Sequence, residues 1–223
     1  MRNCFIHEQE VLGLVTQDTT ILCSHASQVQ SYNQQVFEKL YPNPGDHVLT
    51  PFQHDCHSHP DMQQWLTKKK DFHTLDRVAI GAKVMLTNNI SPSKGATNGA
   101  IGTVHNIDFT CNPDGDQAVR CIHVKLHGSG HIVKVSRTKL RSTYMHARCF
   151  VMRTFPLMLA YAMTGHKSQG ATLTGSTIVH IQSAFTPGLA YVMLSRVVSR
   201  ANLKVVGRLL AEDIVPMTLG TVA

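Results

Sequence analysis

Acidic residues are absent from a long part of this chain, since no Asp or Glu occurs from Gln117 through Ala211. The whole chain carries 21 Lys and Arg against 14 Asp and Glu, a net charge of +7, and many of these cations fall within the acid-free stretch. Cations without nearby carboxylates create a positive field that attracts a polyanion, most often nucleic acid. The alternative is a solvated basic surface that serves solubility.

Signals for membranes and for secretion are missing as well. No apolar run approaches the roughly 20 residues needed to span a bilayer, and the N-terminal sequence lacks the apolar core and cleavage site of a secretory signal. The six cysteines form no CxxC pair, which in a chain of this length favours reduced thiols. We therefore expect no membrane partner and a location in the cytosol, the nucleus or an organellar matrix.

Motifs that hold nucleotide phosphates are absent too. The pattern GxxxxGK[ST], whose lysine and backbone amides hold phosphates, occurs nowhere, and no strand ends in an Asp-Glu pair able to hold Mg²⁺. The adjacent acidic residues Glu212 and Asp213 stand in the reverse order and come late in the chain. We expect this chain alone neither to bind ATP tightly nor to hydrolyse it well.

The N-terminal and C-terminal parts of the chain have the sequence pattern of an α/β domain, in which buried strands alternate with helices. Residues 20–23 read as a buried strand, and a helix follows from Ser27, its expected N-cap, to about Leu40. Buried strands are predicted again at 156–161, 177–181 and 203–206, with a helix after Thr186 and Pro187.

Residues 77–136 have a different texture, with short alternating runs separated by glycine turns. Asn98-Gly99 and the segment 128–130 are typical hairpin turns. We therefore expect a small β-barrel inserted into the α/β domain, with boundaries at 1–76 and 149–223 for the α/β parts and 77–148 for the barrel.

A dense polar cluster, TGHKSQG at 164–170, follows the apolar run at 156–163. In open α/β sheets the carboxyl ends of the strands hold the ligand. Thr164, His166, Lys167 and Ser168 offer donors suited to phosphate oxygens, and Gly170 permits close approach of the backbone. The alternative is a polar loop whose side chains only cap the next helix.

Several segments resemble one known family. PLMLAYAMTGHKSQGATL is similar to motif V, and FTPGLAYVMLSRVVSRANL to motif VI, of superfamily 1 DNA helicases of the petite integration frequency (PIF) family and their Helitron-transposon relatives. TILCSHASQVQSYNQQVFEKL resembles motif IV, and VAIGAKVMLTNNISPSKGATNGAIGTV resembles the start of the family's inserted domain 2B. These matches occur in family order from Thr20 to Val206.

The resemblance implies an α/β fold: a second RecA-like motor domain, called 2A, with an inserted SH3-like barrel, called 2B. Thr164, His166, Lys167 and Ser168 would contact single-stranded DNA, while Gln169 and Gly170 would link DNA to the nucleotide. Arg196 would be the arginine finger that reaches the γ-phosphate of ATP, which the missing N-terminal motor domain would mainly hold together with Mg²⁺. Ser195 would orient its helix. We expect a monomer with roles in DNA repair, recombination and telomere maintenance. Because secretory and transmembrane signals are missing, we expect a nuclear or mitochondrial location.

Two positions depart from the family pattern. Gly165 stands where the family usually has an aliphatic residue, which is expected to loosen the DNA-contacting turn. Leu189 replaces a glutamine that often precedes AYVALSR, although Helitron-type sequences accept leucine.

Three hypotheses follow. The first is the C-terminal half of an ATP-dependent DNA helicase, and the second is a non-catalytic nucleic-acid-binding remnant of a transposon-type helicase. A phosphate loop upstream in the reading frame would support the first hypothesis, and its absence would support the second. The third is a Zn²⁺ site in HDCHSHPD, from His54, Cys56, His57 and His59, whose spacing matches no usual finger. The two helicase hypotheses assign no metal-binding residue to this chain.

Overall fold

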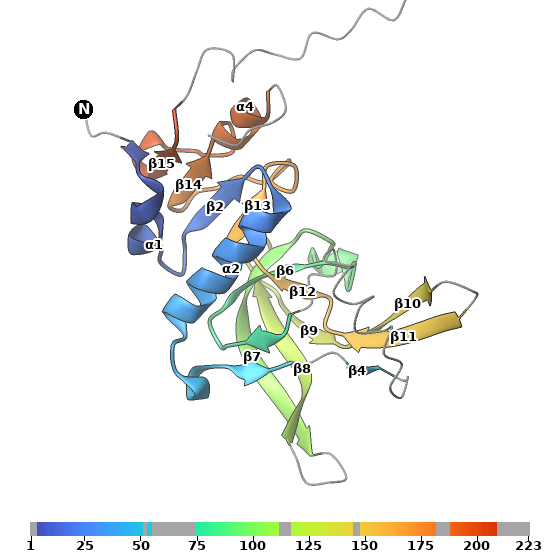
Figure 1. Cartoon of the computed structure of the whole chain (residues 1–223). Coiled ribbons are helices and arrows are strands. Elements are labelled where there is room, and N and C mark those ends of the chain that lie inside the picture. Colours follow the sequence, from blue (N-terminus) through green and yellow to red (C-terminus); the bar gives the residue numbers. More distant parts are fainter. Residues whose placement is uncertain are drawn as a thin grey trace, which may run out of the picture. The chain divides into compact units, whose positions relative to one another are not determined.

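The computed structural model describes residues 4–50, 53–54, 75–111, 117–144, 148–181 and 188–208. The chain divides into two compact units (Figure 1). Unit 1 comprises residues 1–40 and 160–223, and unit 2 comprises residues 41–159. Each unit has its own sheets, and each is described separately below.

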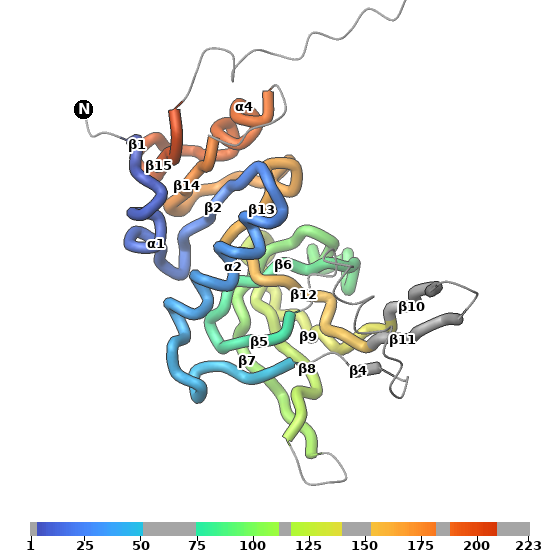
Figure 2. The backbone as a smooth tube through the Cα atoms, in the orientation of Figure 1, coloured from blue at the N-terminus to red at the C-terminus, as the bar shows by residue number. Residues whose placement is uncertain are grey.

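Unit 1 contains a parallel five-stranded sheet. Its order is β1 (Phe5–Ile6), β15 (Leu203–Val206), β14 (Thr177–His180), β2 (Thr20–Cys23) and β13 (Ala162–Thr164). Figure 2, coloured along the chain, shows the blue β1 beside the red β15, so both ends of the described chain meet in this sheet. Every residue of β2 and β14 is buried, as expected for central strands of a parallel sheet.

Helix α2 (Ala26–Leu40) packs on β2 and β13. The predicted apolar face is confirmed, since Val29, Tyr32 and Val36 are buried. The helix begins at Ala26, so Ser27 lies inside its first turn and the predicted N-cap is wrong. The described part of unit 1 also contains two short helices, α1 (Val11–Leu14) and α4 (Leu189–Leu194), and the 3-10 turns η1 (Glu8–Glu10) and η4 (Arg200–Asn202).

Asn33 on α2 holds the edge strand β13 in place. Its Nδ2 donates to the Ala162 carbonyl at 3.0 Å, and its Oδ1 accepts from the Ala162 amide at 2.8 Å. The side-chain amide thus acts as a neighbouring strand would, which satisfies both backbone groups of the buried Ala162 on the edge strand. This contact fixes the strand from which the polar cluster begins.

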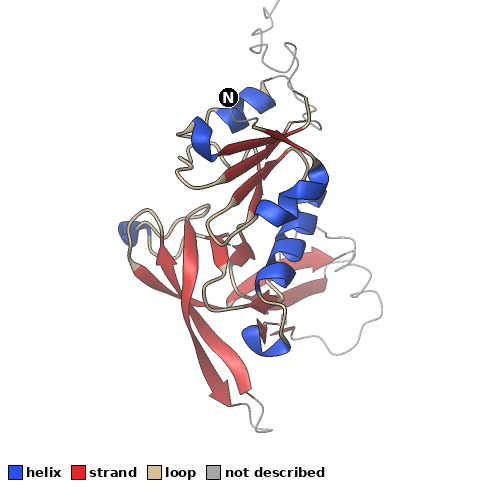
Figure 3. Ribbon diagram, turned by 90° about the vertical axis from the view of Figure 1, so that its left-hand side faces the viewer, coloured by secondary structure: helices blue, strands red, loops and turns tan. Residues whose placement is uncertain are grey.

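Unit 2 consists mostly of strands, as the red ribbons of Figure 3 show. Its main sheet is antiparallel, in the order β12 (Leu157–Leu159), β6 (Lys83–Leu86), β7 (Ile101–Cys111), β8 (Gln117–Leu126) and β9 (Ile132–Ser136). A second sheet has the order β10 (Thr138–Tyr144), β11 (Arg148–Thr154) and β4 (Gln53–His54), and β3 (Val48–Leu49) pairs with β5 (Arg77–Val78). The 3-10 turn η2 (Pro44–Asp46) precedes β3, and the 3-10 turn η3 (Pro92–Lys94) lies between β6 and β7.

The β texture predicted for 77–136 is confirmed, and the segment 128–130 does connect the antiparallel pair β8 and β9. The single strand predicted at 156–161 is wrong. Residues 157–159 pair with β6 in the antiparallel sheet, whereas 162–164 pair with β2 in the parallel sheet. Both strands are apolar, so the sequence shows no boundary between them.

A mixed α/β fold with a parallel sheet is therefore present. Within the described residues no pairing joins β9 to β12, so the SH3-like barrel remains a proposal. The domain boundaries at 76 and 148 also remain predictions, while the compact units divide the chain after Leu40 and after Leu159. The expected cap residues Thr186 and Pro187 lie outside the described residues, and α4 has Gly188 as its N-cap. No described helix is long and apolar enough to cross a membrane.

Candidate nucleic-acid interface

The polar cluster forms a compact turn at the carboxyl end of β13. The Gly165 amide donates to the Cys23 carbonyl at 3.0 Å, which continues the pairing between β13 and β2. The Ser168 amide then donates to the Thr164 carbonyl at 3.1 Å, and the Ala171 amide to the Ser168 carbonyl at 2.9 Å. These hydrogen bonds pair several backbone groups within the turn and connect its start to β2.

The predicted DNA-contacting side chains differ in exposure. His166, Lys167, Gln169 and Gly170 are exposed, and Thr164 is half-buried. The Thr164 hydroxyl accepts a hydrogen bond from the Lys167 amide at 3.4 Å. The turn thus brings the imidazole and the ammonium to the surface from adjacent positions, without any acidic residue in this part of the sequence.

Ser168 lies apart from the exposed group. It is fully buried, and its hydroxyl donates to the Gly165 carbonyl at 2.7 Å. A hydroxyl held this way stabilises the turn.

Gly170 adopts φ +82°, a left-handed backbone conformation that residues with a side chain rarely adopt, and a Cβ there would meet nothing within 4 Å. The backbone conformation at position 170 therefore explains why this residue is glycine.

Gly165 packs directly against α4. A Cβ at this position would lie 2.8 Å from Leu189 Cδ1 and 2.8 Å from Met193 Cγ. The two departures from the family pattern are therefore spatial neighbours, because the Leu189 side chain fills the space that an aliphatic residue at 165 would need. The missing side chain leaves no gap beside the turn.

Arg196 follows α4 and folds back onto its last turn. Its Nε donates to the Val192 carbonyl at 3.1 Å, and its Nη2 donates to the Ser195 hydroxyl at 2.9 Å. Ser195 in turn donates to the same Val192 carbonyl at 2.9 Å. The side chain of the half-buried Arg196 is thus held by the Ser195 hydroxyl and the Val192 carbonyl, while the predicted role of Ser195 in orienting its helix remains a prediction.

A short bridge connects the turn to the arginine segment. Leu173 forms an isolated parallel bridge with Val197. The Leu173 amide donates to the Arg196 carbonyl at 2.9 Å, and the Val198 amide donates to the Leu173 carbonyl at 3.2 Å. The peptide that ends the polar turn is therefore hydrogen-bonded to the peptide of the predicted arginine finger.

Two buried titratable groups lie at the carboxyl ends of the neighbouring strands. Burial raises the pKa of the Cys23 thiol to about 12, and the Glu8 carboxylate adds to this shift. Burial lowers the pKa of His180, with Glu8 opposing the shift. The His180 ring lies 4.9 Å from the Tyr32 ring, and its Nε2 has no hydrogen-bond partner in the described part of the chain. Both groups are neutral at pH 7 and serve packing.

The remaining sequence-based candidates are placed as follows. Thr164, Gly165 and the exposed turn residues share one unit with Arg196, as expected. Of the Zn²⁺ hypothesis, Cys56, His57 and His59 lie outside the described residues, as does the side chain of His54. Asn33 was missed, although an amide on the buried face of an amphipathic helix is a recognisable signal.

Comparison with known proteins decides the family. No protein-family model matches the chain. The human ATP-dependent DNA helicase PIF1 is 32% identical over 187 residues, which are 83% of this chain and 27% of the human protein. The chain is a homologue of the PIF1-type helicase C-terminal region. It spans about a quarter of the length of the PIF1 helicases it matches.

Solved PIF1 structures share the fold. The crystal structure of Pif1 from Candida albicans superposes with a TM-score of 0.65 at 24% identity, covering 88% of this chain and 46% of that one. A Bacteroides Pif1 structure bound to single-stranded DNA gives a TM-score of 0.64 at 23% identity, covering 93% of this chain and 47% of that one. The RecA-like α/β architecture of unit 1 agrees with this PIF1-type fold.

Proposed function

We propose that this chain is the C-terminal half of an ATP-dependent DNA helicase. It binds single-stranded DNA through the turn 164–170 and supplies Arg196 to the γ-phosphate of ATP, which an N-terminal motor domain would hold together with Mg²⁺. The chain contains neither phosphate loop nor Asp-Glu pair, so hydrolysis requires that other domain. The homologous PIF1 proteins are named ATP-dependent DNA helicases, and one related Pif1 was solved with single-stranded DNA.

One observation carries this proposal: the bridge from the turn to the arginine segment. Leu173 closes the turn and hydrogen-bonds to Arg196 and Val198. Gly165, inside the turn, packs against α4, which immediately precedes Arg196. A shift of the turn on DNA therefore moves the guanidinium, and a shift of the guanidinium toward a γ-phosphate moves the turn. Such reciprocity is what coupling between two sites requires.

Within the turn we assign three DNA contacts. The exposed His166 and Lys167 meet phosphate oxygens, and the Thr164 hydroxyl supports them from the strand end. We assign the buried Ser168, predicted from the sequence as a fourth DNA contact, the role of stabilising the turn, because its hydroxyl donates to the Gly165 carbonyl. Gln169 and Gly170 lead the chain from the contact residues to the bridge.

The test compares two lysine variants of the chain in equilibrium binding to a labelled single strand. Lys167→Ala removes a phosphate contact, so the slope of log K against log salt falls by about 0.7 and affinity drops. Lys94→Ala is the matched control, because it removes an exposed lysine from η3 and changes net charge equally. Equal losses in both variants would show that only the general field matters and would refute the assigned contact.

Roles in DNA repair, recombination and telomere maintenance remain predictions, as do the monomeric state and the nuclear or mitochondrial location. Each depends on properties of the intact helicase.

A further inference from the structure

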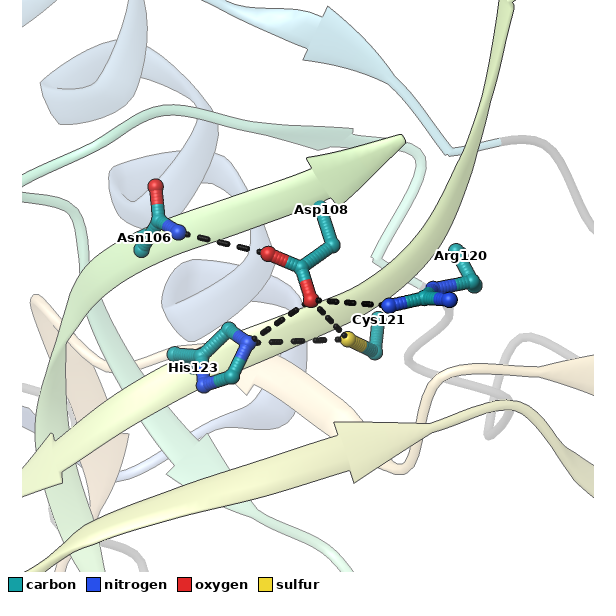
Figure 4. Close-up of polar contacts among 5 residues, drawn as sticks. All are labelled: Asn106, Asp108, Arg120, Cys121 and His123. Atoms are coloured by element: carbon teal, nitrogen blue, oxygen red, sulfur yellow. Dashed lines mark hydrogen bonds and ion pairs between the residues drawn. The ribbon is translucent and has the colours of Figure 1, made fainter. Parts of the chain in front are cut away.

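A cluster of side chains of the types that bind metals lies on the β7–β8 hairpin of unit 2, whereas the residues assigned to DNA and ATP belong to unit 1. Asp108 from β7 and Cys121 and His123 from β8 converge there, with Asn106 and Arg120 beside them (Figure 4). The ligand atoms of Asp108, Cys121 and His123 all lie within 4.8 Å of one another.

Strand pairing explains why these side chains share one face. Asp108 is the cross-strand partner of Cys121, and Asn106 is the partner of His123. Side chains two positions apart point to the same side of a strand, and directly paired residues share a face. The four residues therefore form two adjacent rows on one surface of the hairpin.

Irregularities on either side of Asp108 shape the cluster further. The register shifts between Val104 and Asn106, and again between Asp108 and Phe109. At the second shift Arg120 is an extra residue on β8, because Asp108 pairs with Cys121 and Phe109 pairs with Val119. A β-bulge re-aims the side chain of its extra residue. This is why Arg120 and Cys121, although consecutive, both reach the same carboxylate.

The distances suit a small metal ion. Asp108 Oδ2 lies 3.0 Å from His123 Nε2 and 3.1 Å from Cys121 Sγ, and Cys121 Sγ lies 3.6 Å from His123 Nε2. Tetrahedral Zn²⁺, with bonds of about 2.0–2.3 Å, separates its ligand atoms by about 3.3–3.7 Å. Shifts of a few tenths of an ångström therefore convert the observed triad into three corners of a tetrahedron.

Burial and charge permit entry of an ion. Cys121 is fully buried, while the side chains of Asp108 and His123 are 28% and 26% exposed and face solvent on one side. Arg120 Nη2 approaches Asp108 Oδ2 at 3.4 Å, but its side chain is 60% exposed. The arginine is therefore able to move into solvent when a cation takes its place.

We propose that Asp108, Cys121 and His123 bind Zn²⁺ as a three-residue site with water as the fourth ligand. The thiol proton of Cys121 is released to solvent and the thiolate binds the metal, the Nε2 lone pair of neutral His123 provides a second bond, and Asp108 Oδ2 a third. The ion links β7 to β8 and stabilises the hairpin between its two irregularities. This site is independent of the proposed helicase function.

The test uses Co²⁺ as a probe on the full, reduced chain. A Co²⁺–thiolate site gives a charge-transfer band in the near ultraviolet and strong visible bands when tetrahedral, and excess Zn²⁺ removes both. We expect these bands with one equivalent of Co²⁺, and a higher Tm with Zn²⁺ because the ion binds only the folded hairpin. Absence of a thiolate band in the folded, reduced chain would overturn the proposal.

Variants separate this site from the other cysteine-containing candidate. Cys121→Ser abolishes the thiolate band, whereas Cys56→Ser, in the HDCHSHPD segment, and Cys111→Ser, on an exposed position of β7, preserve it. The reverse pattern would assign the metal to the other segment. Because Cys121 is buried, Asp108→Asn and His123→Gln at part-exposed positions provide a second test. Each keeps the fold and weakens Zn²⁺ binding at least tenfold, and unchanged affinity in both would reject the triad.

Discussion

Replacement of Gly165 by alanine tests the contact between the DNA-binding turn and α4. An alanine Cβ would lie 2.8 Å from Leu189 Cδ1 and from Met193 Cγ, roughly 1 Å closer than ordinary carbon–carbon contact. Both partners are buried, so the turn or the helix has to move. Overpacking of this kind costs about 1–3 kcal/mol. The lower chain entropy of alanine in the unfolded state returns about 0.4–1 kcal/mol.

Gly165→Ala therefore lowers the free energy of unfolding by about 1–2 kcal/mol, which for a chain of this size lowers Tm by roughly 2–8 °C. The assay is thermal unfolding followed by circular dichroism. Gly13→Ala is the matched control, because Gly13 lies in α1 and a Cβ added to it would meet nothing within 4 Å. There alanine raises stability by about 0.5–1 kcal/mol.

A double variant makes the test specific. In the presence of Leu189→Ala, Gly165→Ala loses part of its effect, since one of the two overlapping groups, Leu189 Cδ1, is gone while Met193 Cγ remains. The two changes are therefore non-additive by about 0.5–3 kcal/mol. If Gly165→Ala alone raises Tm, or if the two changes are additive, then the turn does not pack on α4 as described.

Three further outcomes are expected. Asn33→Leu leaves both backbone groups of Ala162 without partners, so the free energy of unfolding measured in urea falls by about 2–4 kcal/mol. The control Gln34→Leu, on the exposed face of the same helix, changes it by less than about 0.5 kcal/mol. Equal effects of the two variants would reject the role of the Asn33 amide. Burial lowers the pKa of His180 in the folded protein, so below a pH of about 6.5 the unfolded state binds more protons than the folded state. The free energy of unfolding therefore falls with decreasing pH, by up to about 1.4 kcal/mol per pH unit. His180→Phe removes this part of the pH dependence, and an unchanged slope in the variant would contradict the lowered pKa. In an intact motor that joins this region to a phosphate-loop domain, Arg196→Ala lowers the rate of ATP hydrolysis by about 10³-fold and retains DNA binding. The control Arg200→Ala retains both activities. If Arg196→Ala instead lost DNA affinity and preserved hydrolysis, the assigned roles would be wrong.

Patterns with a clear period were predicted well from the sequence. The helix over 26–40 has buried residues at helical spacing, and strands β2, β14 and β15 are short apolar runs bounded by polar residues. The polar turn was recognisable because so many hydrogen-bonding side chains directly follow a buried strand. In these cases local periodicity and burial favour the same structure.

Features that depend on pairing between distant segments were not predicted. The apolar run at 156–163 contains two strands that belong to different sheets, and hydrophobicity alone does not separate them. The triad on the β7–β8 hairpin was also missed. Cys121 and His123 are two apart, a spacing that places them on one face of a strand, but their meeting with Asp108 depends on a register set by two irregularities.

The packing of Gly165 shows a similar limit. Its departure from the family pattern predicted a looser turn, because a missing side chain suggests a gap. The structure instead places Leu189 and Met193 in that space. Compensation between residues 24 or more positions apart becomes visible only when their contact is known.

Equilibrium binding of the purified chain to a labelled single strand, without ATP and at low and moderate salt, tests the central claim most directly. The proposal predicts binding that weakens with salt with a slope of about −0.7 for each phosphate contacted, and that double-stranded competitor displaces poorly. Absence of binding at low salt, by a chain shown to be folded from its circular dichroism and cooperative unfolding, would contradict the assignment of turn 164–170 as a DNA-binding element of this region.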